Sequence, residues 1–232
     1  MSTSATATLV ALGVNPASEL TGTTADQTTG RVLPVRGELA DLLPWGGLRR
    51  GSTVSVGGST SLLLALLAGA TADGCWAAVV GLPHLGVLAA AELGVAVPRL
   101  ALVPRPGGEP GAVIAALLDG IDLVAVEVTR SVSPSLARRL SARARQRKAV
   151  LLAFGSWPGA DVELHVVGTR WEGLGRGHGK LRSQTLTVRV GGRGAAARPR
   201  HVELDLVGGG KVVLQGDDWN GAPARKGPTC AS

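Results

Sequence analysis

Residues 54–66 read Val-Ser-Val-Gly-Gly-Ser-Thr-Ser-Leu-Leu-Leu-Ala-Leu, and this stretch decides the fold. An apolar strand runs into a glycine-serine turn and then into an apolar helix, which is the context of a phosphate-binding P-loop. A working loop needs a Gly-Lys-Ser/Thr step where the turn meets the helix, but three leucines follow the turn here. The sequence therefore predicts the architecture of a nucleotide site without its lysine or its magnesium-binding hydroxyl.

Strand and helix patterns alternate from Thr53 to Phe154, after a short helix candidate on the N-terminal side of this stretch. Continuously apolar runs of strand length are typical of parallel strands that are covered on both faces. Ser133 is the expected N-cap of a helix whose first residue is Pro134. The pattern predicts an α/β fold with a mainly parallel central sheet flanked by helices. The expected strands are 53–56, 75–80, 99–103, 123–128 and 149–154, and the expected helices are 38–43, 60–72, 85–93, 110–119 and 134–147.

The pattern changes after Phe154. Three further strands are expected at 162–167, 181–190 and 201–207, with no helix between them. They are therefore predicted to add to the sheet as C-terminal antiparallel strands. The organisation we expect is a flexible N-terminal arm (1–30), one α/β domain (31–215) and a flexible C-terminal tail (216–232).

Composition limits the classes of function. The net charge of +7 and the pI near 10.6 favour an acidic partner, either nucleic acid or protein, although arginine-rich composition alone would also produce them. No apolar run of about 18 residues suggests a membrane span. Two cysteines are too few for a disulfide framework, with Cys75 expected in a core strand and Cys230 in the tail. A cytoplasmic location is the simplest expectation.

Two basic segments are candidates for binding a partner or DNA. In the helix from Ser135, an apolar stripe faces the sheet, so most of the charged side chains face away from it. These charges form either a solvated surface or a surface that binds DNA phosphates or an acidic partner. The segment 169–182 combines basic residues, one tryptophan and four glycines, which suits a binding hot spot, or a tryptophan that closes the core. A single aromatic residue is a poor platform for stacking single-stranded DNA. The candidates are Arg138, Arg139, Arg143, Arg145, Arg147, Lys148, Arg170, Trp171, Arg176, Lys180 and Arg182.

The remaining candidates concern the turn and its surroundings. The turn of Gly57, Gly58, Ser59, Thr60 and Ser61 could bind an anion at the helix N-terminus, but a purely structural connection is favoured. Glu127 lies at the end of an expected strand. It is either a vestigial magnesium ligand or a carboxylate paired with a nearby arginine such as Arg130. No metal site is expected from the scattered histidines, and no hydrolase triad, because no base accompanies the serines. No cofactor is predicted.

The order of elements resembles the RecA recombinase core from about Pro44 to Gly210. The resemblance rests on the glycine-rich segment 46–51, on 85–95 with its Leu-Gly-Val turn, on 121–128 at the Walker B strand, and on 182–210 as a closing hairpin. The resemblance implies a glutamate after the strand 75–80, where this chain has Gly-Leu-Pro-His at 81–84. Segments 129–133 and 155–160 are also too short for the two DNA-binding loops. Without the lysine and the acid, we expect no ATP hydrolysis and no recombinase filament.

Within that family the chain resembles ImuA-type accessory proteins of the bacterial mutasome, in the actinobacterial form. The residues that carry this resemblance are 42–51, the leucines after the turn, and 171–179. It implies a non-catalytic adaptor in DNA-damage-induced translesion synthesis. The implied partners are an inactive Y-family polymerase homologue and an error-prone polymerase, with association with the nucleoid on damage. The alternatives are a SulA-type inhibitor of cell division, a RecA-like ATPase with a non-standard nucleotide site, and a plain DNA-binding module.

Overall fold

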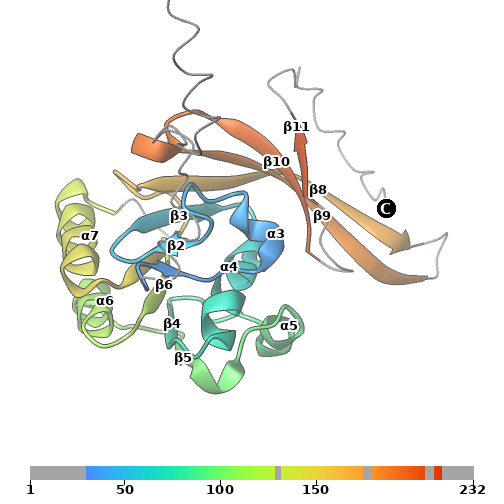
Figure 1. Ribbon diagram of the computed structural model, residues 1–232. Helices are drawn as coiled ribbons and strands as arrows, with labels where there is room; N and C mark the ends of the chain where they lie inside the picture. The colour runs from blue at the N-terminus through green and yellow to red at the C-terminus, as the bar shows by residue number, and fades with distance from the viewer. Residues whose placement is uncertain (1–29, 129–131, 175–178, 207–211, 216–232) are drawn as a thin grey trace, which may run out of the picture.

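The computed structural model describes residues 30–128, 132–174, 179–206 and 212–215. The predictions for the tail (216–232), for Arg130 and Arg176, and for all of the arm except Gly30 lie outside these residues. The described part is built on a nine-stranded mixed sheet in the order β11-β10-β9-β8-β3-β7-β6-β4-β5 (Figure 1). A small antiparallel sheet of β1 (Val32–Leu33) and β2 (Leu48–Arg49) lies beside it.

The half of the sheet that ends in β5 is parallel, as predicted. The side chains of the inner strands are buried because helices cover both of their faces, whereas the edge strand β5 is partly exposed. This buried half positions the predicted nucleotide loop. Its strands are β3 (Thr53–Gly57), β4 (Ala77–Val80), β5 (Leu100–Val103), β6 (Leu123–Glu127) and β7 (Val150–Phe154).

Helices cover the two faces unequally (Figure 1). The short α3 (Gly37–Ala40), α4 (Thr60–Ala72) and α5 (Val87–Glu92) share one hydrophobic core with the sheet. The helices α6 (Pro110–Leu118) and α7 (Pro134–Arg147) form a second core on the other face, against β4, β6 and β7, and Val103 of β5 packs against this core. The predicted cap of α7 is confirmed, since the Ser133 hydroxyl accepts the N–H of Leu136 at 3.3 Å. Among the described residues, no helix is long and apolar enough to cross a membrane.

The C-terminal strands extend the sheet and form a long ribbon that projects from the body (Figure 1). They are β8 (Val162–Leu174), β9 (Gly179–Gly192), β10 (Arg200–Asp205) and β11 (Val212–Gln215). The pairs β8–β9 and β9–β10 are antiparallel, as predicted, and β11, which the sequence pattern did not predict, is antiparallel to β10. Strand β8 ends at Leu174 instead of the expected 167, and β9 extends two residues beyond each end of the expected 181–190.

The expected orientation of β8 is wrong, because β8 lies parallel to β3. Parallel neighbours usually need a long crossover, and the short segment after Phe154 suggested none. The segment 155–161 is long enough to connect β7 to a strand that is parallel to β3, because it runs back beside β3. The N–H of Gly155 bonds to the carbonyl of Val56, and the N–H of Asp161 bonds to that of Thr53, each at 2.8 Å. The distance to be spanned is about 10 Å, well within the reach of seven residues.

Cys75 does not lie in a core strand, which corrects a second expectation. It ends the turn that closes α4: the N–H of Gly74 bonds to the Thr71 carbonyl, and that of Cys75 to the Ala70 carbonyl. This is a Schellman motif, with Gly74 at a φ of 96°. The backbone of Cys75 is thus used by the helix end, and β4 begins two residues later.

Candidate functional site

The turn between β3 and α4 has the backbone that the sequence predicts. Gly58 adopts a φ of 86°, which favours glycine, and Ser59 caps the helix by accepting the N–H of Leu62 at 3.4 Å. The turn lies at the carboxyl end of the parallel strands, where open α/β sheets bind their ligands. The local architecture is therefore a strand, a glycine turn and a capped helix at the ligand-binding end of the sheet.

The chemistry of this turn differs from that of a working loop. When Gly57 is taken as the first glycine of the P-loop pattern, Leu62, Leu63 and Leu64 occupy the Gly-Lys-Ser/Thr positions. Their exposed fractions are 0%, 0% and 3%, and all three pack in the larger hydrophobic core. A side chain at the lysine position thus extends into the core, where a charged group would be costly.

Strand β8 also crowds the turn. Gly57 is in register with His165, and a Cβ added to Gly57 would lie 2.5 Å from the Nδ1 atom of that imidazole. A Cβ on Gly58 would lie 2.7 Å from the backbone oxygen of Val166. At Gly58 the close atom belongs to the backbone of β8, so this approach needs glycine there, whereas at Gly57 it belongs to the His165 side chain.

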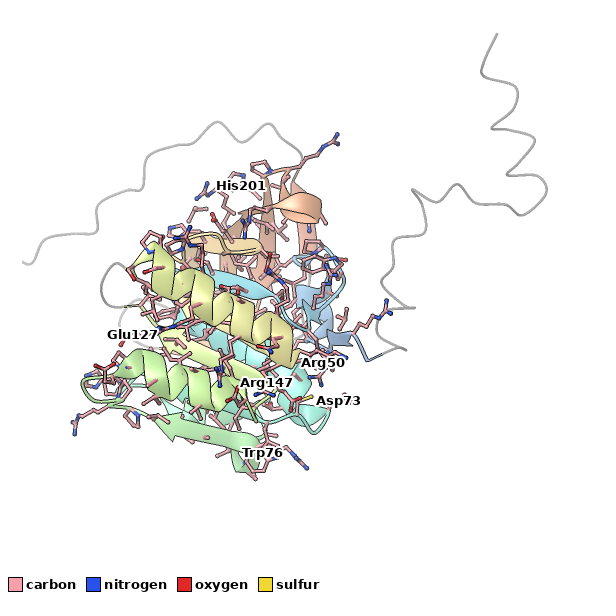
Figure 2. All side chains as sticks on the ribbon, turned by 90° about the vertical axis from the view of Figure 1, so that its left-hand side faces the viewer. Arg50, Asp73, Trp76, Glu127, Arg147 and His201 are labelled. Carbon is pink, nitrogen blue, oxygen red and sulfur yellow. The ribbon has the colours of Figure 1, made fainter. Side chains whose placement is uncertain are left out.

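Glu127 lies at the same end of the sheet as the turn, as the position of its strand predicts. It is the last residue of β6, which is separated from β3 by β7. Figure 2 shows Glu127 at the opposite end of the sheet from Arg50. The carboxylate makes no ion pair or hydrogen bond with the residues that the structure describes, and the Arg130 alternative lies outside them. The turn after β4 brings no carboxylate, since residues 81–84 are Gly-Leu-Pro-His.

A polar cavity of about 480 Å³ opens next to the turn. It lies over β3, β8 and β9, the part of the sheet that α6 and α7 do not cover. Its lining includes the ionisable residues Glu163, His165 and Arg189, with Ser55 and Ser156 beside them. Glu163, His165 and Arg189 were not among the predicted site residues, although alternation along β8 and β9 could have identified them as outward-facing side chains. Within the described ranges, no group of three or more His, Cys, Asp or Glu residues could hold a metal ion.

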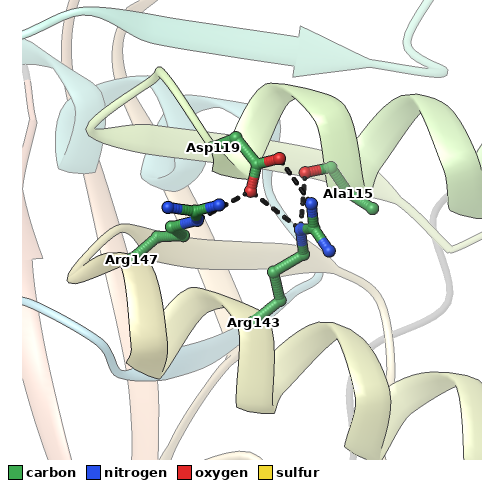
Figure 3. A network of polar contacts seen from close by, with 4 residues as sticks. All are labelled: Ala115, Asp119, Arg143 and Arg147. Atoms are coloured by element: carbon green, nitrogen blue, oxygen red, sulfur yellow. Dashed lines mark hydrogen bonds and ion pairs between the residues drawn. The ribbon is translucent and has the colours of Figure 1, made fainter.

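The basic helix α7 divides its charges between two roles. Arg143 and Arg147 both bind Asp119 at the end of α6, through Nε–Oδ1 distances of 2.8 and 3.0 Å (Figure 3). The Arg143 Nε also donates to the Ala115 carbonyl at 3.1 Å. Hydrogen bonding from Arg143, with the positive charge of both arginines, lowers the pKa of Asp119, and the same contact raises the pKa of Arg143. These two arginines join α6 to α7.

The other basic residues of α7 lack such partners. Arg138, Arg139 and Arg145 are exposed and make no hydrogen bond or ion pair through their side chains with the described part of the chain. Lys148 ends the helix in the left-handed conformation, and its carbonyl accepts from Arg50 at 3.4 Å. Thus only part of the predicted basic face remains available for a ligand.

The ribbon presents Trp171 to solvent. Its side chain is 49% exposed, so the alternative that Trp171 closes the core is wrong. Arg170 and Glu172 flank it and form an exposed ion pair, with 3.6 Å between Arg170 Nε and Glu172 Oε1. Lys180 and Arg182 belong to the facing strand β9. The tryptophan that fills a core is Trp157, whose indole N–H donates to the Ser141 hydroxyl at 3.1 Å.

The MT3502 N-terminal domain family matches residues 41–159, just over half of the chain. The chain belongs to this family. The MT3502 N-terminal domain as matched here contains the turn at Gly57, Glu127 and all of α7, and it ends before β8. The chain is also similar to Uncharacterized protein Rv3395c of Mycobacterium tuberculosis, with 44% identity over 128 residues. That alignment covers 53% of this chain and 63% of the relative's length.

Proposed function

We propose that this protein is a non-catalytic adaptor with a RecA-like fold, which acts in a translesion-synthesis complex through protein contacts. The observation that carries the absence of catalysis is the burial of Leu63 at the position of the phosphate-binding lysine. Phosphoryl transfer depends on a lysine and magnesium placed around the phosphates, and the turn supplies neither.

The topology supports the RecA-like part of the proposal. The turn after β3 and the end of β6 meet at the carboxyl end of a parallel sheet, in the relative positions that a P-loop and a Walker B strand require. Antiparallel strands then close the sheet, as the resemblance implies for residues 182–210. The fold is consistent with a nucleotide-binding ancestor whose site has been filled by apolar side chains.

The projecting ribbon supports the adaptor part of the proposal. Exposed tryptophan with neighbouring arginine is the composition that dominates binding hot spots. Trp171 is 49% exposed and belongs to neither hydrophobic core, so its side chain is available to a partner. We assign Trp171 and Arg170 to the contact with the inactive Y-family polymerase homologue or with the error-prone polymerase.

The test is affinity capture of the full chain from DNA-damaged cells, followed by identification of the bound proteins. We expect the two polymerases to be recovered, and Trp171→Ala to reduce their recovery by about tenfold or more. Trp76→Ala is the matched control, because Trp76 is also an exposed tryptophan, at 46%, and lies before β4. It should leave recovery unchanged.

Other outcomes would contradict the proposal. Recovery of the tubulin-like division protein, without the polymerases, would support the SulA-type alternative. Equal loss of recovery in Trp171→Ala and Trp76→Ala would show that the ribbon is not the contact surface.

A further inference from the structure

A basic groove runs beside α7, lined by Arg49, Arg50, Arg138, Arg145 and Arg193. It consists of two adjoining hollows of about 360 and 440 Å³, which share Arg145 and Arg193. The first hollow continues to Arg49 and Arg50, and the second continues to Arg138 in the second turn of α7. Pro158 and Gly159, from the connection between β7 and β8, line the second hollow opposite the helix.

The charge of the basic groove is strongly one-sided. Five arginines line the two hollows, and the single carboxylate among the lining residues is Asp161. That carboxylate accepts the N–H of Thr53 at 2.9 Å, so it is already used in joining β3 to the connection before β8. It also forms a long ion pair with Arg193, at 3.9 Å, which offsets part of the positive charge but leaves an excess from the other lining arginines. The groove therefore attracts anions.

Three of the five arginines are held in place by fixed partners. The Arg49 guanidinium lies 5.4 Å from the centroid of the Trp45 ring, an arrangement that favours a cation–π contact. Arg50 pairs with Asp122 at 2.9 Å, and Arg193 donates to the Gly159 carbonyl. Such preorganised side chains lose less conformational entropy when a ligand binds.

Arg138 and Arg145 supply the unpaired charge. Neither makes a side-chain hydrogen bond or ion pair with the described residues. They lie on the same helix as Arg143 and Arg147, but those two face α6 and bind Asp119. The groove thus uses one side of α7, whereas the other side is committed to packing the helix pair.

We propose that the basic groove binds the sugar-phosphate backbone of a nucleic acid strand. Small-molecule sites are mostly apolar with a few polar groups, which does not describe this lining. Arginine forks match phosphate oxygens in pairs. Arg138 and Arg145 are separated by about 10 Å along the helix, which is the rise of about three nucleotides.

The location separates this site from the nucleotide loop. Arg50 lies at the end of the sheet opposite to Glu127 (Figure 2), and the groove runs from there along α7. The proposal does not rest on the adaptor role, since a protein of another function could use the same groove. An acidic protein would also be attracted by the charge, and the test must distinguish it.

The test is fluorescence anisotropy of the full chain with a labelled oligothymidylate of about 20 nucleotides, at about 50 and 200 mM salt. We expect binding that weakens steeply with salt. Replacing two groove residues, as Arg138→Ala with Arg145→Ala, should weaken it by about tenfold or more and lower the salt dependence. Arg139→Ala is the matched control, because Arg139 leaves the same helix toward a separate hollow beside α6. It should change affinity by less than about twofold.

Three results would overturn the proposal. One is the absence of binding by the wild-type chain at the lower salt. Another is an equal loss of affinity in Arg139→Ala. The third is competition by polyglutamate that is as strong as competition by unlabelled oligonucleotide, which would indicate an acidic protein ligand. Comparison with a DNA duplex of the same length shows whether single-stranded or double-stranded DNA binds more tightly. The double variant should weaken binding of the form that the wild-type chain binds. Circular dichroism of each variant confirms that it is folded.

Discussion

Gly58 of the β3–α4 turn and Val166 of β8 approach so closely that a Cβ on Gly58 would lie 2.7 Å from the Val166 carbonyl oxygen. This contact joins the predicted phosphate loop to the C-terminal ribbon, which the sequence pattern alone does not connect. It also gives the turn a structural role that needs no bound nucleotide.

Gly58→Ala should therefore destabilise the fold by more than backbone strain alone. Gly74→Ala is the control, because Gly74 has a similar positive φ of 96° but nothing within 4 Å of an added Cβ. We expect the free energy of unfolding to fall by about 1–3 kcal/mol more in Gly58→Ala than in Gly74→Ala. Urea unfolding of both variants measures the difference. Equal losses would mean that β8 does not constrain the turn.

Restoring the lysine of the loop should damage the core and should not create a nucleotide site. Leu63 is fully buried, so Leu63→Lys places an ammonium group among leucines. We expect a loss of at least about 3 kcal/mol in unfolding free energy, against less than about 1.5 kcal/mol for the control Leu63→Met. A folded Leu63→Lys protein that gains ATP binding would show that the lysine position still faces the ligand.

The contact between α6 and α7 should depend on pH through Asp119. Its pKa is lower in the folded protein than in the unfolded chain, mainly because Arg143 donates hydrogen bonds to it. The stabilisation is therefore complete above about pH 5 and is lost as the pH falls through the lowered folded pKa. Asp119→Asn should be less stable than wild type at pH 7, and the difference should shrink below about pH 4. A difference in unfolding free energy that stays constant from neutral to acid pH would be inconsistent with this.

Cys75 should react slowly for a thiol. Burial, and then the negative charge of Asp122, raise its pKa and reduce the thiolate fraction near pH 8. In a Cys230→Ala variant, alkylation of Cys75 should be about tenfold slower in the folded protein than in urea. Equal rates in the two conditions would indicate an open, unperturbed thiol.

Much of the α/β core could be predicted from sequence because its signals are local. Continuous apolar runs identify the buried strands, and the Ser133-Pro134 pair identifies the start of α7. The parallel placement of β8 could not be predicted, because it depends on backbone hydrogen bonds that tie 155–161 to β3. The Schellman turn at Cys75 was likewise hidden by the apolar character of the residues around it.

The candidate sites were predicted less completely, for a physical reason. Sequence places five arginines on α7, with Lys148 at its end, but only the tertiary contact with Asp119 shows that Arg143 and Arg147 are structural. The groove partners Arg49, Arg50 and Arg193 come from segments far apart in the chain, so no local pattern unites them. The exposure of Trp171 excludes the interpretation that it closes the core, and its contact with a partner stays a prediction.

We propose that the turn at Gly57 keeps the backbone shape of a phosphate loop without binding a nucleotide. Isothermal titration of the full chain with ATP and magnesium tests this most directly. We expect no saturable heat, corresponding to a Kd weaker than about 1 mM, and the same result for Glu127→Gln. Micromolar binding of ATP that Glu127→Gln abolishes would contradict the account.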